Sequence, residues 1–357
     1  MAASGLTDES LADGASADPL DVAVPEAALP SDRRIRRGSR HPLLRYALRR
    51  LIAGIGLAIA VSMLIFAATQ VLPGDSARAI LGRQANPVAL ANLRHQLGLD
   101  RSLVRQYASW LWGMMRGDLG TSYASHGPVS KLLAGRTFNT LVLATVALIV
   151  IIPLSLVLGA LAGVRRGKAV DHVISGLTLG AVAIPDFVTG TLLAAAFAVS
   201  LKWLPAVSLV PSGKSPLDTP DILILPIATL LISGLAANIR MVRAGVATEM
   251  ESDYVEAARL NGVPEGRIIR RHVFRNALAP SVQTFAMTVQ WLVGGVIVVE
   301  AVFQYPGIGQ SLVSAVGLRD AAVVQSLGFL IALAYIVINI LADVAVVLLV
   351  PRLRTAA

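Results

Sequence analysis

One charge-free stretch, residues 141–164, limits the possible folds of this chain more than any other feature. It reads LVLATVALIVIIPLSLVLGALAGV. About 20 apolar residues are enough for a helix to cross the hydrocarbon core of a bilayer. Inside a bilayer the backbone must satisfy its own hydrogen bonds, and only helices and closed barrels can do so. The run is continuous rather than alternating, so it predicts a transmembrane helix.

Similar runs recur along the chain and predict an all-α, polytopic membrane protein. Charged residues make up 15% of the sequence and hydrophobic residues 55%, whereas about a quarter of a soluble domain is charged. Six transmembrane helices are expected, near residues 51–71, 139–164, 173–201, 222–241, 281–303 and 324–350.

The absence of cysteine excludes disulfides, thiol nucleophiles and cysteine-ligated metal sites. The net charge of +9 matches the basic cytoplasmic loops of membrane proteins. Membrane lipid is therefore the expected partner, and nucleic acid is not.

The basic residues predict an orientation. Residues 1–32 hold seven acids and no base, and eight arginines follow by residue 50. We therefore expect a disordered cytoplasmic tail over 1–40 and a transmembrane domain over 41–357. With both termini cytoplasmic, 20 Lys and Arg lie inside and 11 outside, as the positive-inside rule requires.

The same orientation places segment 72–138 outside the membrane and segment 248–280 in the cytoplasm. Within the outer segment, Tyr107, Trp110, Leu111 and Met114 fall on one helical face. This face predicts either a helix packed at the membrane surface or a surface for a partner.

A polar interruption between the fourth and fifth apolar runs, residues 251–280, reads ESDYVEAARLNGVPEGRIIRRHVFRNALAP. Ser252 or Asp253 can cap a first helix, and Asn261–Gly262 can end it in left-handed geometry. Pro264 suits the first position of a second helix. The pattern predicts a rigid helix–turn–helix, which is either a docking element or a well-capped loop.

Several motifs resemble one family. Glu256-Ala257-Ala258, followed by Gly262, resembles the EAA…G signature of the membrane subunits of ABC importers. Further strings resemble the first permease subunit of the dipeptide and oligopeptide importers: LPGD at 72–75, LGLD at 97–100, GDLGTS at 117–122, RNALAP at 275–280, EAVFQYPGIGQSLVSAVGLRDAAVVQ at 300–325 and the closing NILADVAVVLLVPRLR. Phe274–Arg275 stands where the wider importer family has Leu-Pro, and tail 1–32 has no recognised counterpart.

The resemblance implies a type I ABC importer fold in a bacterial cytoplasmic membrane. The chain would form half of a pore with a second, homologous permease subunit. Two ATP-binding subunits and an extracytoplasmic substrate-binding protein would complete the transporter, with peptides as cargo and nickel chelates or glutathione as alternatives. The residues implied in docking to the ATP-binding subunits are Glu256, Ala257, Ala258, Arg259, Asn261 and Gly262.

The resemblance also implies that this chain is not itself an enzyme and holds no cofactor, since ATP and Mg²⁺ would be bound by the partner subunits. The sequence agrees with this. Gly213-Lys214-Ser215 has the ending of a phosphate-binding loop, but Ser208 stands where that motif needs glycine.

Acids in or beside membrane spans are functional candidates. Asp186, Glu300 and Asp343 are candidate residues of the translocation pathway. Each also has a simpler interpretation: Asp186 and Asp343 could pair with another helix, and Glu300 could be an anchor at the membrane interface or part of an outer gate. A proton-coupled secondary transporter could use such acids, but it would have no use for the polar hairpin.

Overall fold

The computed structural model describes residues 42–71, 77, 81, 86–96, 98, 100–211 and 213–349. All of the regular elements described belong to the compact unit His41–Ala357. The predicted tail 1–40, the LPGD string, two residues of LGLD and the end of the chain after 349 lie outside the described residues.

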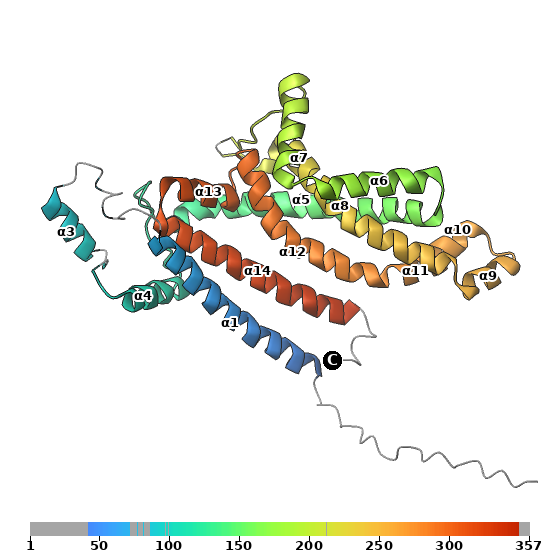
Figure 1. Ribbon diagram of the computed structural model, residues 1–357, viewed down its shortest axis with the longest axis horizontal. Helices are drawn as coiled ribbons and strands as arrows, with labels where there is room; N and C mark the ends of the chain where they lie inside the picture. Colours follow the sequence, from blue (N-terminus) through green and yellow to red (C-terminus); the bar gives the residue numbers. More distant parts are fainter. Residues whose placement is uncertain are drawn as a thin grey trace, which may run out of the picture. The chain divides into compact units, whose positions relative to one another are not determined.

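The elements named in the described part are helical (Figure 1). They are α1 (Pro42–Val71), α3 (Pro87–Gln96), α4 (Leu103–Met115), α5 (Val129–Val164), α6 (Ala169–Ala183), α7 (Asp186–Leu193), the π-helix η1 (Ala194–Ser200), the 3₁₀ turn η2 (Pro216–Asp218), α8 (Asp221–Met250), α9 (Asp253–Leu260), α10 (Glu265–Ile268), the π-helix η3 (Ile269–Val273), α11 (Phe274–Ala277), α12 (Ala279–Val302), α13 (Ile308–Leu318) and α14 (Ala321–Leu349).

The apolar helices confirm the all-α membrane fold. Five of those described are long and apolar enough to cross a bilayer, and a sixth crossing results if the bent pair α6–α7 counts as one span. The five segments are Leu48–Gln70, Val129–Val164, Asp221–Met250, Pro280–Val302 and Ala321–Val346.

The third crossing differs from the continuous helix expected over 173–201. It is broken between Ala183 and Asp186, and its two halves meet at 107°. Ile184 has extended backbone angles (φ −101°, ψ 123°), because the ring of a following proline disfavours helical geometry in the residue before it. Pro185 is the N-cap of α7, so the chain restarts as a helix in a new direction.

Helix α8 is the central helix of the fold. Figure 1 shows α5 and α6 running beside α8, and α1 beside α14. Close approach of α5 depends on Gly159 and Gly163: a Cβ atom on these glycines would lie 2.6 Å from Val242 Cβ and 2.7 Å from Val246 Cβ. Small residues allow membrane helices to pack this closely.

Helix α8 is also longer than the run 222–241 predicted from hydropathy. It continues to Met250 and includes both Arg240 and Arg243. The charged Arg243 can lie within this apolar helix because it forms an ion pair with Asp171 of α6. The polar hairpin therefore follows directly from a continuous helix.

The apolar face predicted within segment 72–138 packs inside the protein. The ring of Tyr107 lies 5.5 Å from that of Phe66 in α1, and Trp110 lies 5.9 Å from Phe329 in α14. The Tyr107 hydroxyl is 2.7 Å from Ser62 Oγ. Helix α4 is thus fastened to α1 and α14, which supports the packing interpretation of this face.

Candidate functional site: the polar hairpin

The first helix of the hairpin, α9, begins where the sequence predicts. Ser252 is its N-cap, with extended backbone angles (φ −78°, ψ 147°). Its hydroxyl does not cap the helix, however, and donates instead to the Glu249 carbonyl at 2.6 Å. That bond ties the start of α9 back to the end of α8.

The turn after α9 is left-handed at one residue. Gly262 has φ +72°, and its N–H donates to the Arg259 carbonyl at 2.9 Å. Asn261 has an ordinary φ of −80°, and its side-chain amide donates to the Ala257 carbonyl at 2.9 Å. Pro264 is the N-cap of α10 rather than its first helical residue, so the predicted start was one residue too early.

The inner face of the hairpin is apolar and buried. Val255, Ile268 and Val273 are each 0% exposed, and they cluster with Val242 and Val246 of α8. Val273 lies five positions after Ile268, and the π-helix that ends at Val273 turns both side chains inward. This packing fixes the hairpin to the end of α8.

A second close contact fixes the same junction. A Cβ atom on Gly245 would lie 2.5 Å from the carbonyl oxygen of Ala277. Helix α11 therefore meets α8 backbone to backbone, and displacement of the hairpin must displace α8 with it.

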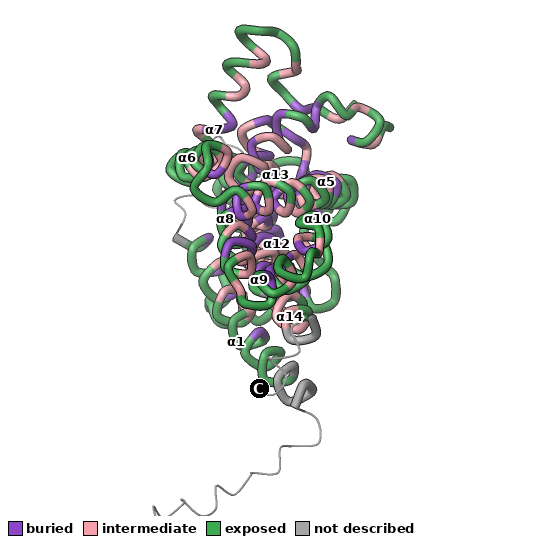
Figure 2. The backbone as a smooth tube through the Cα atoms, turned by 90° about the vertical axis from the view of Figure 1, so that its right-hand side faces the viewer, coloured by how far each residue is buried: buried purple, intermediate pink, exposed green. Residues whose placement is uncertain are grey.

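The outer face of the hairpin is exposed (Figure 2). Of the residues predicted to dock, Ala258 is half-buried, whereas Glu256, Ala257, Arg259, Asn261 and Gly262 are exposed. Leu260 is 83% exposed, and sequence reasoning missed it. The sequence contains a signal for this residue, because Leu260 is an apolar residue at the end of α9, away from Val255, the residue that α9 buries.

One ion pair braces this face across the turn. Arg259 Nη2 lies 2.7 Å from Glu265 Oε1. The hydrogen bond from Arg259 lowers the pKa of Glu265, and the same bond raises the pKa of Arg259. Both side chains are well exposed, so the pair orients α9 relative to α10 and adds little stability.

Two of the acids predicted for the pathway lie on different helices. Asp186 is the first residue of α7, directly after the bend, and is half-buried. Asp343 of α14 forms an ion pair with Arg50 of α1 at 3.1 Å.

The third acid, Glu300, is fully buried. Its carboxylate accepts hydrogen bonds from the Thr140 hydroxyl at 2.6 Å and from the backbone amides of Gly309 and Gln310 at 2.7 and 3.2 Å. These amides belong to the first turn of α13, where a negative charge is favourable. Glu300 therefore fixes the start of α13 against α5 and α12.

Sequence reasoning missed Asp171 altogether. This carboxylate is 2% exposed and pairs with Arg243. The clue was an acid three residues after the basic turn 165–168, but its partner lies 72 residues further along the chain.

A bundle of apolar helices with a rigid polar hairpin at one end defines a polytopic helical membrane protein. Comparison with known proteins gives the family. Residues 155–355 match the family described as binding-protein-dependent transport system inner membrane component, and residues 43–158 match the N-terminal part of such membrane components. The chain belongs to this family, the permease subunits of ABC importers.

Named relatives agree with this assignment. A Brucella abortus (strain 2308) protein named as a peptide transport system permease is 34% identical over 307 residues, covering 86% of this chain and 98% of its own. The glutathione transport system permease protein GsiC of Salmonella choleraesuis is 35% identical over 312 residues, covering 87% and 99%. A Brucella suis biovar 1 protein named as a peptide permease is 35% identical over 318 residues, covering 87% and 99%.

The family assignment confirms the resemblance seen in the sequence. The chain is a multi-pass inner-membrane protein and a transport subunit. An importer of this kind works with other subunits.

Proposed function

We propose that this chain forms half of the pore of an ATP-driven importer of peptides, and that the exposed face of α9 docks on a separate ATP-binding subunit. The observation that carries the proposal is the construction of the hairpin. Its inner face is buried against α8, and its outer face presents Glu256, Ala257 and Leu260 to solvent. A rigid, exposed hairpin at the end of α8 can transmit the motion of a bound subunit to the membrane helices.

The docking surface consists of residues of α9 and the following turn. Ala257 and Gly262 permit close approach of a partner backbone, and the Glu256 carboxylate can accept a basic side chain or a backbone amide. Leu260, at the end of α9, offers an exposed apolar contact on this surface. The members of the docking surface are Glu256, Ala257, Ala258, Arg259, Leu260, Asn261 and Gly262.

The proposed partners follow from the family. They are a second, homologous permease subunit, two ATP-binding subunits that hold ATP and Mg²⁺, and an extracytoplasmic substrate-binding protein. The geometry supports docking of the ATP-binding subunits and of the substrate-binding protein at opposite ends of the helix bundle. The Arg166–Glu251 ion pair, at 2.6 Å, joins the turn after α5 to the hairpin end. Asn139, near the other end of α5, donates to the Pro306 carbonyl at 2.9 Å.

The hairpin end is proposed to face the cytoplasm. Basic residues concentrate there, including Arg165, Arg166 and the hairpin arginines, as the positive-inside rule predicts. A helix of 36 residues such as α5 is about 54 Å long, enough to cross the bilayer. The end near Pro306 would then face the substrate-binding protein.

Asp186 remains the proposed pathway residue among the three acids. It lies at the break of α6–α7, where a bend in a membrane helix exposes polar groups. Glu300 and Asp343 have protein partners that account for their positions.

Peptides are the proposed cargo because the Brucella relatives are named as peptide permeases. Glutathione is the second candidate because the Salmonella relative is named as its permease. Glutathione is itself a small peptide, so both candidates call for a pathway that accepts amide and carboxylate groups.

Uptake of labelled peptide into cells tests the energy source. We expect ATP depletion to abolish uptake, and collapse of the proton gradient at constant ATP to leave it intact. The reverse pattern would identify a proton-coupled carrier and contradict the proposal. Competition by unlabelled glutathione would distinguish the two cargoes.

A further inference from the structure

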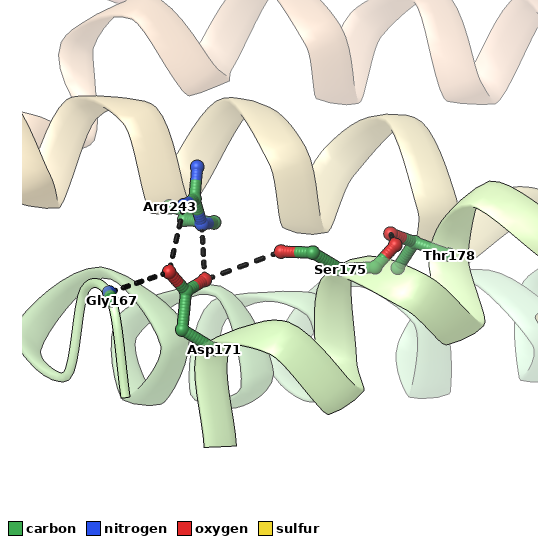
Figure 3. Close-up of polar contacts among 5 residues, drawn as sticks. All are labelled: Gly167, Asp171, Ser175, Thr178 and Arg243. Carbon is green, nitrogen blue, oxygen red and sulfur yellow. Dashed lines mark hydrogen bonds and ion pairs between the residues drawn. The ribbon is translucent and has the colours of Figure 1, made fainter. Parts of the chain in front are cut away.

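An ion pair between the buried Asp171 and the half-buried Arg243 connects the first half of the broken helix to the helix that carries the hairpin (Figure 3). Arg243 of α8 donates to both carboxylate oxygens of Asp171, through Nε to Oδ1 and through Nη2 to Oδ2 at 2.8 Å. The Gly167 amide donates to Oδ2 at 2.9 Å, and the Ser175 hydroxyl donates to Oδ1 at 3.2 Å. Both oxygens of the carboxylate are therefore fully used.

Helix α6 has little else that is buried. Only Asp171 and Thr178 of its residues are buried, and Thr178 bonds within its own helix, to the Ser175 carbonyl. The apolar residues Val173 and Leu177 are 60% and 70% exposed. The pair with Arg243 is thus the principal specific link from the start of α6 to α8.

Arg243 is placed where the hairpin is anchored. Its neighbour Gly245 meets the Ala277 carbonyl, and Val246 packs in the buried cluster of the hairpin. A shift of the hairpin is therefore transmitted to Arg243 and, through the ion pair, to Asp171.

The second half of the broken helix is held at the far end of α12 and by Thr229 of α8, 14 residues before Arg243. A Cβ atom on Gly190 of α7 would lie 3.2 Å from Phe303 and 3.3 Å from Val302, at the far end of α12. The bend at Ile184–Pro185 separates the two attachments. Motion at the hairpin end would therefore be absorbed at this bend, beside Asp186.

We propose that Asp171 and Arg243 are positioning residues that make α6 move with the hairpin as one body, so that docking-driven motion bends the broken helix at Ile184–Pro185. The inference rests on the proposed function and extends it, by giving a route from the docking surface to the pathway.

Two cysteines introduced into this cysteine-free chain allow the proposal to be tested by spin labelling. Val173→Cys in α6 and Arg271→Cys in the hairpin place labels on exposed sites of the two elements. The transporter is purified complete with its partner subunits, and the distribution of distances between the two labels is measured. We expect the same narrow distribution without nucleotide and with a non-hydrolysable ATP analogue. In Asp171→Asn this distribution should be broader, or should differ between the nucleotide-free and the nucleotide-bound transporter.

Peptide uptake and ATP hydrolysis in reconstituted vesicles give a second readout. We expect Asp171→Asn to lower the uptake per ATP hydrolysed about fivefold or more, at unchanged complex yield. The matched control is Arg166→Gln, which removes the exposed neighbouring pair with Glu251 and should keep the wild-type ratio. In the labelling experiment, a distance between the two labels that changes with nucleotide while Asp171 is intact would overturn the proposal.

A purely structural role for the pair would also overturn it, and would appear as a parallel fall in uptake, hydrolysis and complex yield in Asp171→Asn. Failure of the proposed function would look different. Uptake would then be independent of ATP in the wild type and in Arg166→Gln, whereas the label distances would still report on α6 and the hairpin.

Discussion

Gly262→Arg should leave the protein in the membrane and abolish its association with the ATP-binding subunits. Gly262 is exposed at φ +72°, and no atom lies within 4 Å of the position a Cβ would occupy. The substitution strains the turn by about 1–2 kcal/mol and places a long cation on the docking surface. Loss of such a central contact typically costs about 2 kcal/mol or more of binding free energy. Co-purification of the subunits from solubilised membranes measures the effect.

Gly213→Arg is the matched control. Gly213 also has a left-handed backbone (φ +76°) and open space around it, but it lies in the loop before α8, far from the hairpin in sequence. Both variants therefore add the same strain and the same charge. Normal recovery of the ATP-binding subunits with Gly262→Arg, or equal loss with Gly213→Arg, would remove the turn from the docking surface.

The second large effect is expected at Glu300, which should be needed for a stable fold. Glu300→Ala leaves the Thr140 hydroxyl and the amides of Gly309 and Gln310 without their acceptor in a buried site. Each such unsatisfied group costs about 1–3 kcal/mol. We expect a loss of about 3 kcal/mol or more in stability, seen as a lower melting temperature of the purified protein and faster proteolysis near α13.

A conservative change should be much milder. Glu300→Gln keeps one oxygen for the two backbone amides, and the Thr140 hydroxyl can rotate to accept from the new amide group. Gln304→Ala removes an exposed side chain from the same segment and serves as the control. Equal melting temperatures for Glu300→Ala and Gln304→Ala would show that the carboxylate does not fix the start of α13.

The features that the sequence predicted well are those set by local chemistry. Long apolar runs have no stable alternative to a helix in a bilayer, so five crossings appear at the predicted runs, although α5 begins ten residues before its run and α8 ends nine residues after its run. The Asn261–Gly262 stop and the Pro264 restart are likewise encoded within a few residues, and the hairpin follows from them.

The features that it missed depend on residues far apart in the chain. Proline at 185 predicts that backbone geometry will change, but the 107° bend is set by what each half packs against. Asp171 finds its partner 72 residues away, and Glu300 finds Thr140 at a separation of 160. No local pattern identifies such pairs, so the coupling route through α6 was not foreseen.

The central claim, that the exposed face of α9 contacts an ATP-binding subunit in the cytoplasm, is tested most directly by photo-crosslinking. Leu260→Cys in this cysteine-free chain can carry a benzophenone-maleimide label, and Trp203→Cys, 70% exposed in the loop after η1, is the control. We predict that illumination of the intact transporter attaches position 260, and not position 203, to an ATP-binding subunit. Attachment of position 260 to lipid or to the substrate-binding protein alone would contradict the account.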